Sequence, residues 1–185
     1  MDKHLCGTCG EPMARGVGTE EYSECGLDNV VLVNVPIWTR PRGHADSQIP
    51  AIDSLHAVMA RALIVSPRPL AGAEVRFLRK YLGYSARVFG RHIGVHHVAL
   101  SRIENGHQRI PRKFDTLVRL FSAQAVCERD GRAFPEKILP VLAALAETTL
   151  DLGHALRVQH LDLEGGDRMA EPGHAWRRST AGAPA

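Results

Sequence analysis

Aromatic residues, cysteines and long apolar runs are all scarce in this sequence of 185 residues. Phe, Trp and Tyr make up 5% of it, and there are four cysteines. No apolar run approaches the roughly 20 residues that a membrane-spanning helix needs. The first residues, MDKHLCGTCG, lack the apolar core of a secretory leader. We therefore expect a cytoplasmic protein with no membrane segment, in which four cysteines do not indicate a disulfide framework.

Residues arranged for catalysis are also missing. No Ser/His/Asp set and no pair of carboxylates stands out in the sequence. The short glycine pair at Gly16–Gly18 lacks the helix and the further glycine of a nucleotide-binding fingerprint. The sequence therefore does not predict an enzyme.

Positive charge is concentrated in the middle third of the chain. Residues 61–120 contain 12 Lys and Arg against 3 Asp and Glu, whereas the segments on either side are mildly acidic. Such a basic segment suits a polyanionic partner. A solvated basic face is the alternative that charge alone leaves open, so the motifs within the segment must decide.

The order of predicted elements is that of a mainly α protein with a small β-containing segment at its N-terminus. Val30–Val35 is rich in β-branched residues and predicts a strand, with Pro36 as a turn signal after it. Apolar residues at helical spacing predict a helix at 51–65, a helical cluster at about 71–122 and another helix at 135–152. The later stretch LRVQHLDL fits a short strand or a continuing helix, and the composition of the tail predicts disorder.

The most informative stretch is FGRHIGVHHVALSRIENG, Phe89–Gly106. Gly94 can adopt the positive φ that ends a helix, and Gly90 lies where a side chain would hold the following helix away. Two short helices across such a turn are a helix-turn-helix. The residues that we expect on its inner side are Phe89, Ile93, Val95, Leu100 and Ile103.

The opposite side of the second helix carries groups suited to reading DNA. Arg102 can donate a bidentate fork to guanine O6 and N7, and Val98 can contact a thymine methyl group. Charged residues beside the helix can contact phosphates, which position the protein without specifying sequence. An ordinary helical bundle with solvated polar residues is the alternative, but the motif coincides with the basic segment. The predicted DNA-binding residues are Arg87, His96, His97, Val98, Ser101, Arg102, His107 and Arg109.

One ion pair is also expected within this motif. Glu104 falls at the C-terminal end of a helix, where the macrodipole disfavours an acid. We therefore predict that Arg79 of the preceding helix pairs with Glu104 and ties the two helices together. The alternative is that Glu104 faces water.

The sequence CGTCG near the N-terminus is a C-x-x-C turn that can present two thiolates to a zinc ion. No second C-x-x-C follows, so the remaining ligands of a tetrahedral site would come from isolated residues. Reduced or redox-active thiols and an inert turn are the alternatives to a metal site. The candidate zinc ligands are Cys6, Cys9, Cys25 and His44.

Two parts of the chain resemble a known family. The stretch LAGAEVRFLRKYLGYSARVFGRHIGVHHVALSRIENGHQRI resembles the Xre-type, lambda-repressor-like helix-turn-helix, and residues 5–65 resemble the zinc-finger segment of MqsA-like (YgiT-type) antitoxins and regulators. The resemblance implies a dimeric DNA-binding repressor, with a toxin partner in some members. Arg40 and Gly43 stand where the second pair of zinc ligands belongs, and Ala86 replaces the glutamine that opens the second helix.

Together these observations predict five parts and one function. The predicted function is that of a sequence-specific transcriptional repressor that binds double-stranded DNA as a homodimer. A narrower version of this prediction is that the repressor is the antitoxin of a toxin-antitoxin pair. The rival interpretation is a protein-interaction adaptor with a vestigial helix-turn-helix. The five parts are a degenerate zinc-finger-like segment at 1–50, a helix and linker at 51–69, the helix-turn-helix domain at 70–122, a helical region at 123–160 and a disordered tail at 161–185.

Overall fold

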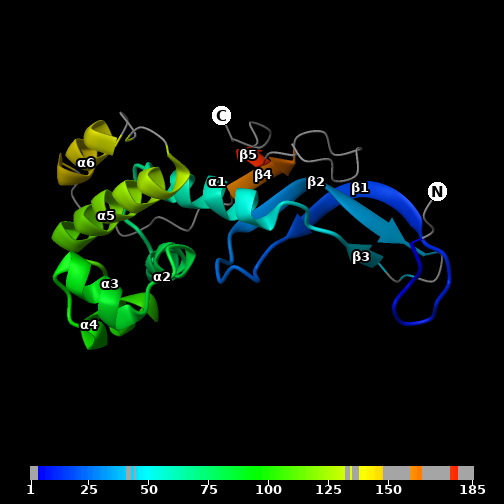
Figure 1. Ribbon diagram of the computed structural model, residues 1–185, viewed down its shortest axis with the longest axis horizontal. Coiled ribbons are helices and arrows are strands. Elements are labelled where there is room, and N and C mark those ends of the chain that lie inside the picture. Colours follow the sequence, from blue (N-terminus) through cyan, green and yellow to red (C-terminus); the bar gives the residue numbers. More distant parts are fainter. Residues whose placement is uncertain are drawn as a thin grey trace. The chain divides into compact units, whose positions relative to one another are not determined.

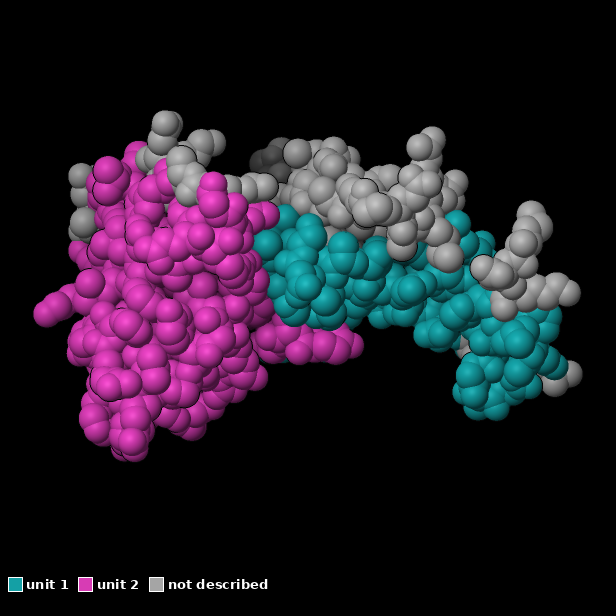
Figure 2. All heavy atoms as spheres, in the orientation of Figure 1, with its two compact units in different colours: residues 1–23, 28–58, 158–185 teal, residues 24–27, 59–157 magenta. Residues whose placement is uncertain are grey.

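The computed structural model of the chain describes most residues between His4 and Arg178. The described residues are 4–40, 43, 45–131, 134, 138–147, 159–163 and 176–178, without the side chains of 144–147, 159–163 and 176–178. The chain divides into two compact units, which are coloured separately in Figure 2. Residues 1–23, 28–58 and 158–185 form the sheet unit, and residues 24–27 and 59–157 form the helical unit.

The sheet unit is built around one long strand, β2 (Figure 1). β2 pairs in antiparallel fashion with β1 and β3 and in parallel fashion with β4, which in turn pairs with β5. Buried side chains alternate along parts of β2 because one face of the strand contributes to the core. The strands are β1 (Ala14–Glu21), β2 (Val30–Thr39), β3 (Ala45–Ser47), β4 (Gln159–Leu163) and β5 (Trp176–Arg178).

β2 runs through Pro36, so the prediction that Pro36 marks a turn after the strand is wrong. The register with β1 shifts between Gly18 and Glu20, where Asn34 of β2 has a φ of 60°. β2 pairs with β4 before this bulge and with β3 after it, while β1 pairs with β2 on both sides of the bulge. Pro36 lacks an N–H, but its carbonyl oxygen still accepts a hydrogen bond from the backbone of Gln48 at 3.2 Å. The bulge therefore lets one strand serve two partners along the same edge.

The expectation of a disordered tail is wrong over two segments. Gln159–Leu163 forms β4 beside Val30–Val33 of β2, and Trp176–Arg178 forms β5 beside β4. Of the two alternatives left open for LRVQHLDL, the strand is therefore observed over its last five residues. Composition favoured disorder, but the exposed edge of β2 offers unpaired backbone groups that a distant segment can satisfy. The remainder of the predicted tail lies outside the described residues.

Six helices are seen in the described part of the chain, as the sequence pattern predicted in outline. The predicted boundary at residue 122 falls inside α5, which continues to Asp130, and residues 135–137 of the predicted last helix lie outside the described part. None of these helices is both long and apolar enough to span a bilayer. The helices are α1 (Ile52–Ile64), α2 (Gly72–Tyr81), α3 (Ala86–Ile93), α4 (His97–Glu104), α5 (Arg112–Asp130) and α6 (Ile138–Glu147).

A fully buried arginine on α5 organises the helical unit. Arg119 donates through Nε to Asp115 at 3.0 Å, one turn earlier on the same helix. Its Nη1 and Nη2 atoms donate to four backbone oxygens at the end of α1 and in the linker, those of Leu63, Ile64, Ser66 and Arg68, at 2.6–2.9 Å. Burial raises the pKa of the Asp115 carboxyl, and Arg119 opposes that rise. Because last-turn carbonyls of a helix lack helical partners, Arg119 fixes the end of α1 and the path of the linker.

Candidate nucleic-acid interface

α3 and α4 are separated by a tight turn whose geometry matches the sequence prediction. The hydroxyl of Ser85 accepts a hydrogen bond from the backbone of Val88 and caps the start of α3. Gly94 ends α3 with φ 70° and ψ 29°, the left-handed conformation that glycine adopts without steric strain. A Cβ atom at Gly90 would overlap the carbonyl oxygen of Val95, so only glycine lets the backbone after the turn come this close.

A second glycine supports α4 from the other side. A Cβ atom at Gly72, the first residue of α2, would overlap the carbonyl oxygen of Ile103 near the end of α4. Gly72 was not singled out from the sequence, because its close contact is with a residue far away in the chain. α4 is thus held between the backbones of two other segments, at Gly90 and at Gly72. The inner side chains expected from the sequence, Phe89, Ile93, Val95, Leu100 and Ile103, are all buried.

The opposite side of α4 faces outward. Val98 is 52% exposed, although it is apolar, and Ser101 and Arg102 are exposed beside it. His97 is half-buried and His96 is exposed at the start of the helix, where its Nδ1 accepts a hydrogen bond from the backbone of Val98 at 3.4 Å. Val98 and the hydrogen-bonding side chains beside it are therefore accessible to another molecule.

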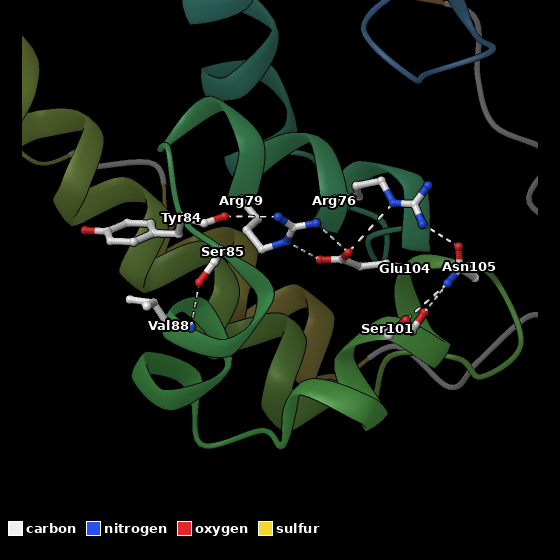
Figure 3. A network of polar contacts seen from close by, with 8 residues as sticks. All are labelled: Arg76, Arg79, Tyr84, Ser85, Val88, Ser101, Glu104 and Asn105. Carbon is white, nitrogen blue, oxygen red and sulfur yellow. Dashed lines mark hydrogen bonds and ion pairs between the residues drawn. The ribbon is translucent and has the colours of Figure 1, made fainter.

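An ion pair holds the C-terminal end of α4 against α2 (Figure 3). Arg79 donates from Nε and Nη2 to the two carboxylate oxygens of Glu104 at 2.7 and 2.8 Å. The same guanidinium donates to the backbone oxygen of Tyr84 at 3.0 Å, and Arg76 lies 3.7 Å from Glu104. Glu104 is buried, so the alternative that it faces water is wrong. The pair that the sequence analysis expected therefore fixes where the exposed face of α4 lies.

The acidic residues of the basic segment do not reach its surface. All three, Glu74, Glu104 and Asp115, are buried, and each pairs with an arginine. The charge left on the outside is consequently positive. The exposed cations on α3, α4 and the residues that follow are Arg87, Arg91, Arg102, Arg109, Arg112 and Lys113. This distribution favours a negatively charged partner.

The predicted DNA-binding residues come from three consecutive segments of the helical unit. Arg87 is exposed on α3, and His107 and Arg109 are exposed between α4 and α5. The others, His96, His97, Val98, Ser101 and Arg102, lie at the start of α4 or on it. Their contact with DNA stays a prediction.

Two residues beside the exposed face were missed by the sequence analysis. Asn105, directly after α4, donates to Ser101, and Arg76 of α2 donates to Asn105 (Figure 3). The first contact is a local one that a capping argument could have found, since residues four apart on a helix are neighbours. The second joins residues 29 positions apart, and no sequence pattern announces it.

The C-x-x-C turn is held by an arginine in the structure. Gly10 donates a backbone hydrogen bond to Cys6, closing the turn, and Cys6 is buried while Cys9 is exposed. Nη1 of Arg40 lies 2.7 Å from Sγ of Cys9 and 2.9 Å from a carboxylate oxygen of Glu11. The positively charged guanidinium of Arg40 thus contacts the sulfur atom that a metal ion would bind, and the two positive charges would repel each other.

The described residues do not fit a zinc site. No group of three or more His, Cys, Asp and Glu that could hold a metal ion occurs in the part of the chain that the structure describes. His44, one of the four predicted ligands, lies outside the described residues. The four-ligand set of Cys6, Cys9, Cys25 and His44 therefore stays a prediction without support from the observed donors.

A family model described as a helix-turn-helix domain matches residues 70–133, from the end of the linker to just beyond α5. The chain contains a helix-turn-helix domain. This match supports a DNA-binding regulator and confirms the predicted helix-turn-helix, while its assignment to the Xre type and the likeness of residues 5–65 to MqsA-like proteins stay predictions. No curated protein and no solved structure matches the chain.

Proposed function

We propose that the chain is a sequence-specific transcriptional repressor in which the exposed face of α4 enters the major groove of DNA. The observation that carries the proposal is the contrast across α4, where the inner residues are buried and Val98, Ser101 and Arg102 are exposed. A helix of this size fits the major groove, which presents a distinct pattern of donors and acceptors for each base pair. The domain match over residues 70–133 supports the same class of function.

The residues divide into two roles. Arg102 donates its fork to guanine, and Val98 contacts a thymine methyl group, so these two specify sequence. Arg87, His107 and Arg109 contact phosphates and set the orientation of the helix on the duplex. His96 and His97, at the start of α4, contribute hydrogen bonds at the entrance to the groove. Affinity then falls as salt rises, because neutralised phosphates release counterions.

The proposal includes a homodimer bound to two half-sites. With two-fold symmetry, the half-sites lie about one helical turn apart. In its narrower form the proposal makes the chain an antitoxin, which rests on the resemblance of residues 5–65. The test of this form is whether the chain relieves growth arrest caused by the product of a neighbouring reading frame.

The experiment that tests the main proposal is selection of bound sequences from random duplexes by the full chain. A repressor of this kind enriches one motif containing a guanine, repeated with two-fold symmetry. Recovery of unenriched DNA would contradict the proposal and favour the adaptor, in which the helix-turn-helix is vestigial.

A further inference from the structure

β1 lies at an edge of the sheet, with its outer side open. It pairs with β2 on one side, and no strand pairs with its other side in the part of the chain that the structure describes. Exposed edge strands are often short, bulged or interrupted by proline, which prevents pairing with other chains. β1 spans eight residues, ARGVGTEE, and the extra residue of the bulge, Asn34, lies in β2. The outer edge of β1 is therefore a regular template for another strand.

Two contacts show which backbone groups of β1 point outward. The N–H of Tyr22, directly after β1, donates to Val30 at 2.9 Å, so the even-numbered residues of β1 direct their backbone groups toward β2. Opposite Val17, Pro36 has no N–H, and its carbonyl oxygen accepts from Gln48 on the other side of β2. Since successive residues of a strand alternate, the odd-numbered residues direct their N–H and C=O groups to the open edge. These residues are Arg15, Val17, Thr19 and Glu21.

The charges of β1 are arranged for pairing with a copy of the same strand. Arg15 lies near its start and Glu21 at its end, and both are exposed. Neither side chain makes an ion pair with another described residue. An antiparallel copy brings each arginine toward a glutamate, and the outward groups allow hydrogen-bonded pairs between odd-numbered residues. The register with Gly18 on the two-fold axis satisfies both conditions, because it sets Arg15 opposite Glu21 and Val17 opposite Thr19.

We propose that two copies of this chain join along β1, antiparallel about a two-fold axis at Gly18, to form one continuous sheet. The inference rests on the proposed function for the homodimer and names the surface at which it forms. Backbone hydrogen bonds provide the affinity, whereas the pairs of Arg15 with Glu21 select the register, since exposed ion pairs contribute little. Loss of the Arg15 charge alone therefore leaves the dimer largely intact, while its reversal sets like charges opposite each other.

The first test is Val17→Pro, which removes one outward N–H in each copy and leaves the hydrogen bonds of β1 to β2 in place. Proline is tolerated in an edge strand where the N–H faces solvent, so the circular dichroism spectrum should stay native. Each neutral hydrogen bond contributes about fivefold, so dimer affinity should fall about 25-fold. Sedimentation equilibrium of full-length protein without DNA measures this change. Val17→Thr is the matched control, because it keeps the N–H and a β-branched side chain, and it should dimerise like the wild type.

The second test is a charge exchange that does not depend on proline. Arg15→Glu and Glu21→Arg each set like charges opposite each other in a dimer of identical chains, so each variant should dimerise about tenfold more weakly than the wild type. In an equimolar mixture of the two variants, opposite charges face each other again at both ends, and the affinity should return. Lys80→Glu and Glu24→Arg are matched reversals at exposed positions outside β1, and both should dimerise like the wild type.

Three results would overturn the inference. One is a wild type that stays monomeric at high micromolar concentration, and this includes a chain whose β1 edge binds an extended segment of another protein instead of a second copy. Another is a dimer that V17P and both charge reversals leave unchanged, which would place the interface elsewhere. The last is a mixture of R15E and E21R that associates no better than either variant alone. Because these measurements need no DNA, they are separate from duplex selection, whose failure would contradict the proposed function and leave this dimer in place.

Discussion

The position of α4 depends on a single buried carboxylate keeping its partner. Glu104 has a side chain 4% exposed and receives two hydrogen bonds from Arg79. Arg79→Met is expected to destabilise the fold by about 3 kcal/mol, because a buried charge then lacks its main partner. Urea unfolding followed by far-ultraviolet circular dichroism measures this change.

The double variant Arg79→Met/Glu104→Leu is the control for this prediction. It removes both charges and fills the space with apolar groups, so it is expected to recover most of the loss. If the single and double variants were equally unstable, the cost would come from lost packing of Arg79 and not from the unpaired carboxylate.

A histidine in the sheet unit makes that unit sensitive to acid. Burial lowers the pKa of His56, and Asp53 raises it less, while Nε2 lies 2.9 Å from the hydroxyl of Tyr22. The unfolded chain therefore takes up a proton at higher pH than the folded one, so stability falls as pH decreases through about 6.5. The urea midpoint reported by tryptophan fluorescence is expected to fall between about pH 7.5 and about pH 5.5.

Other histidines titrate in the same range, so the comparison with His56→Gln isolates this effect. Gln can hydrogen-bond Tyr22 but does not titrate. The stability of the wild type relative to H56Q should decrease toward acid pH, and a constant difference would show that His56 does not contribute.

At the scale of elements, features set by neighbouring residues were predicted from the sequence, whereas features set by distant contacts were not. The start of α3 at Ser85 and its end at Gly94 followed from capping and glycine chemistry, which act over a few residues. β4 could not be assigned, because it depends on the edge of β2 more than a hundred residues earlier in the chain, and β5 in turn pairs with β4. The exposed face of α4 was predicted from helical spacing, whereas the contact of Arg76 with Asn105 was not.

The buried Arg119 was also invisible to sequence patterns, which place charged residues at the surface. Its Nη atoms donate hydrogen bonds to four carbonyl oxygens at the end of α1 and in the linker, and its Nε donates to Asp115. Arg119→Lys keeps the charge but cannot reach these oxygens with one compact ammonium group. The variant is expected to lose about 3 kcal/mol of stability in calorimetry or urea unfolding.

Arg91→Lys provides a matched substitution on α3, where the arginine is exposed. It should change stability by less than about 0.5 kcal/mol. Equal effects of the two substitutions would contradict the structural role assigned to Arg119.

At the scale of the whole molecule, the sheet unit is expected to fold without zinc. Arg40 holds Cys9 and Glu11, and the described residues contain no group of three metal ligands. Full-length protein prepared without chelators should carry no stoichiometric zinc in native mass spectrometry. One zinc ion per chain, lost together with the native circular dichroism spectrum on chelation, would show that the predicted ligands, His44 included, do assemble.

The central claim concerns the outer face of α4, and Arg102 tests it most directly. Equilibrium binding of the full chain to its selected duplex should weaken by about 1–3 kcal/mol in Arg102→Ala, with relaxed preference at one base. Arg15→Ala removes the same charge from an exposed position of β1 and should leave affinity within about twofold. Equal affinity and an unchanged motif in Arg102→Ala would contradict the claim that this face reads DNA.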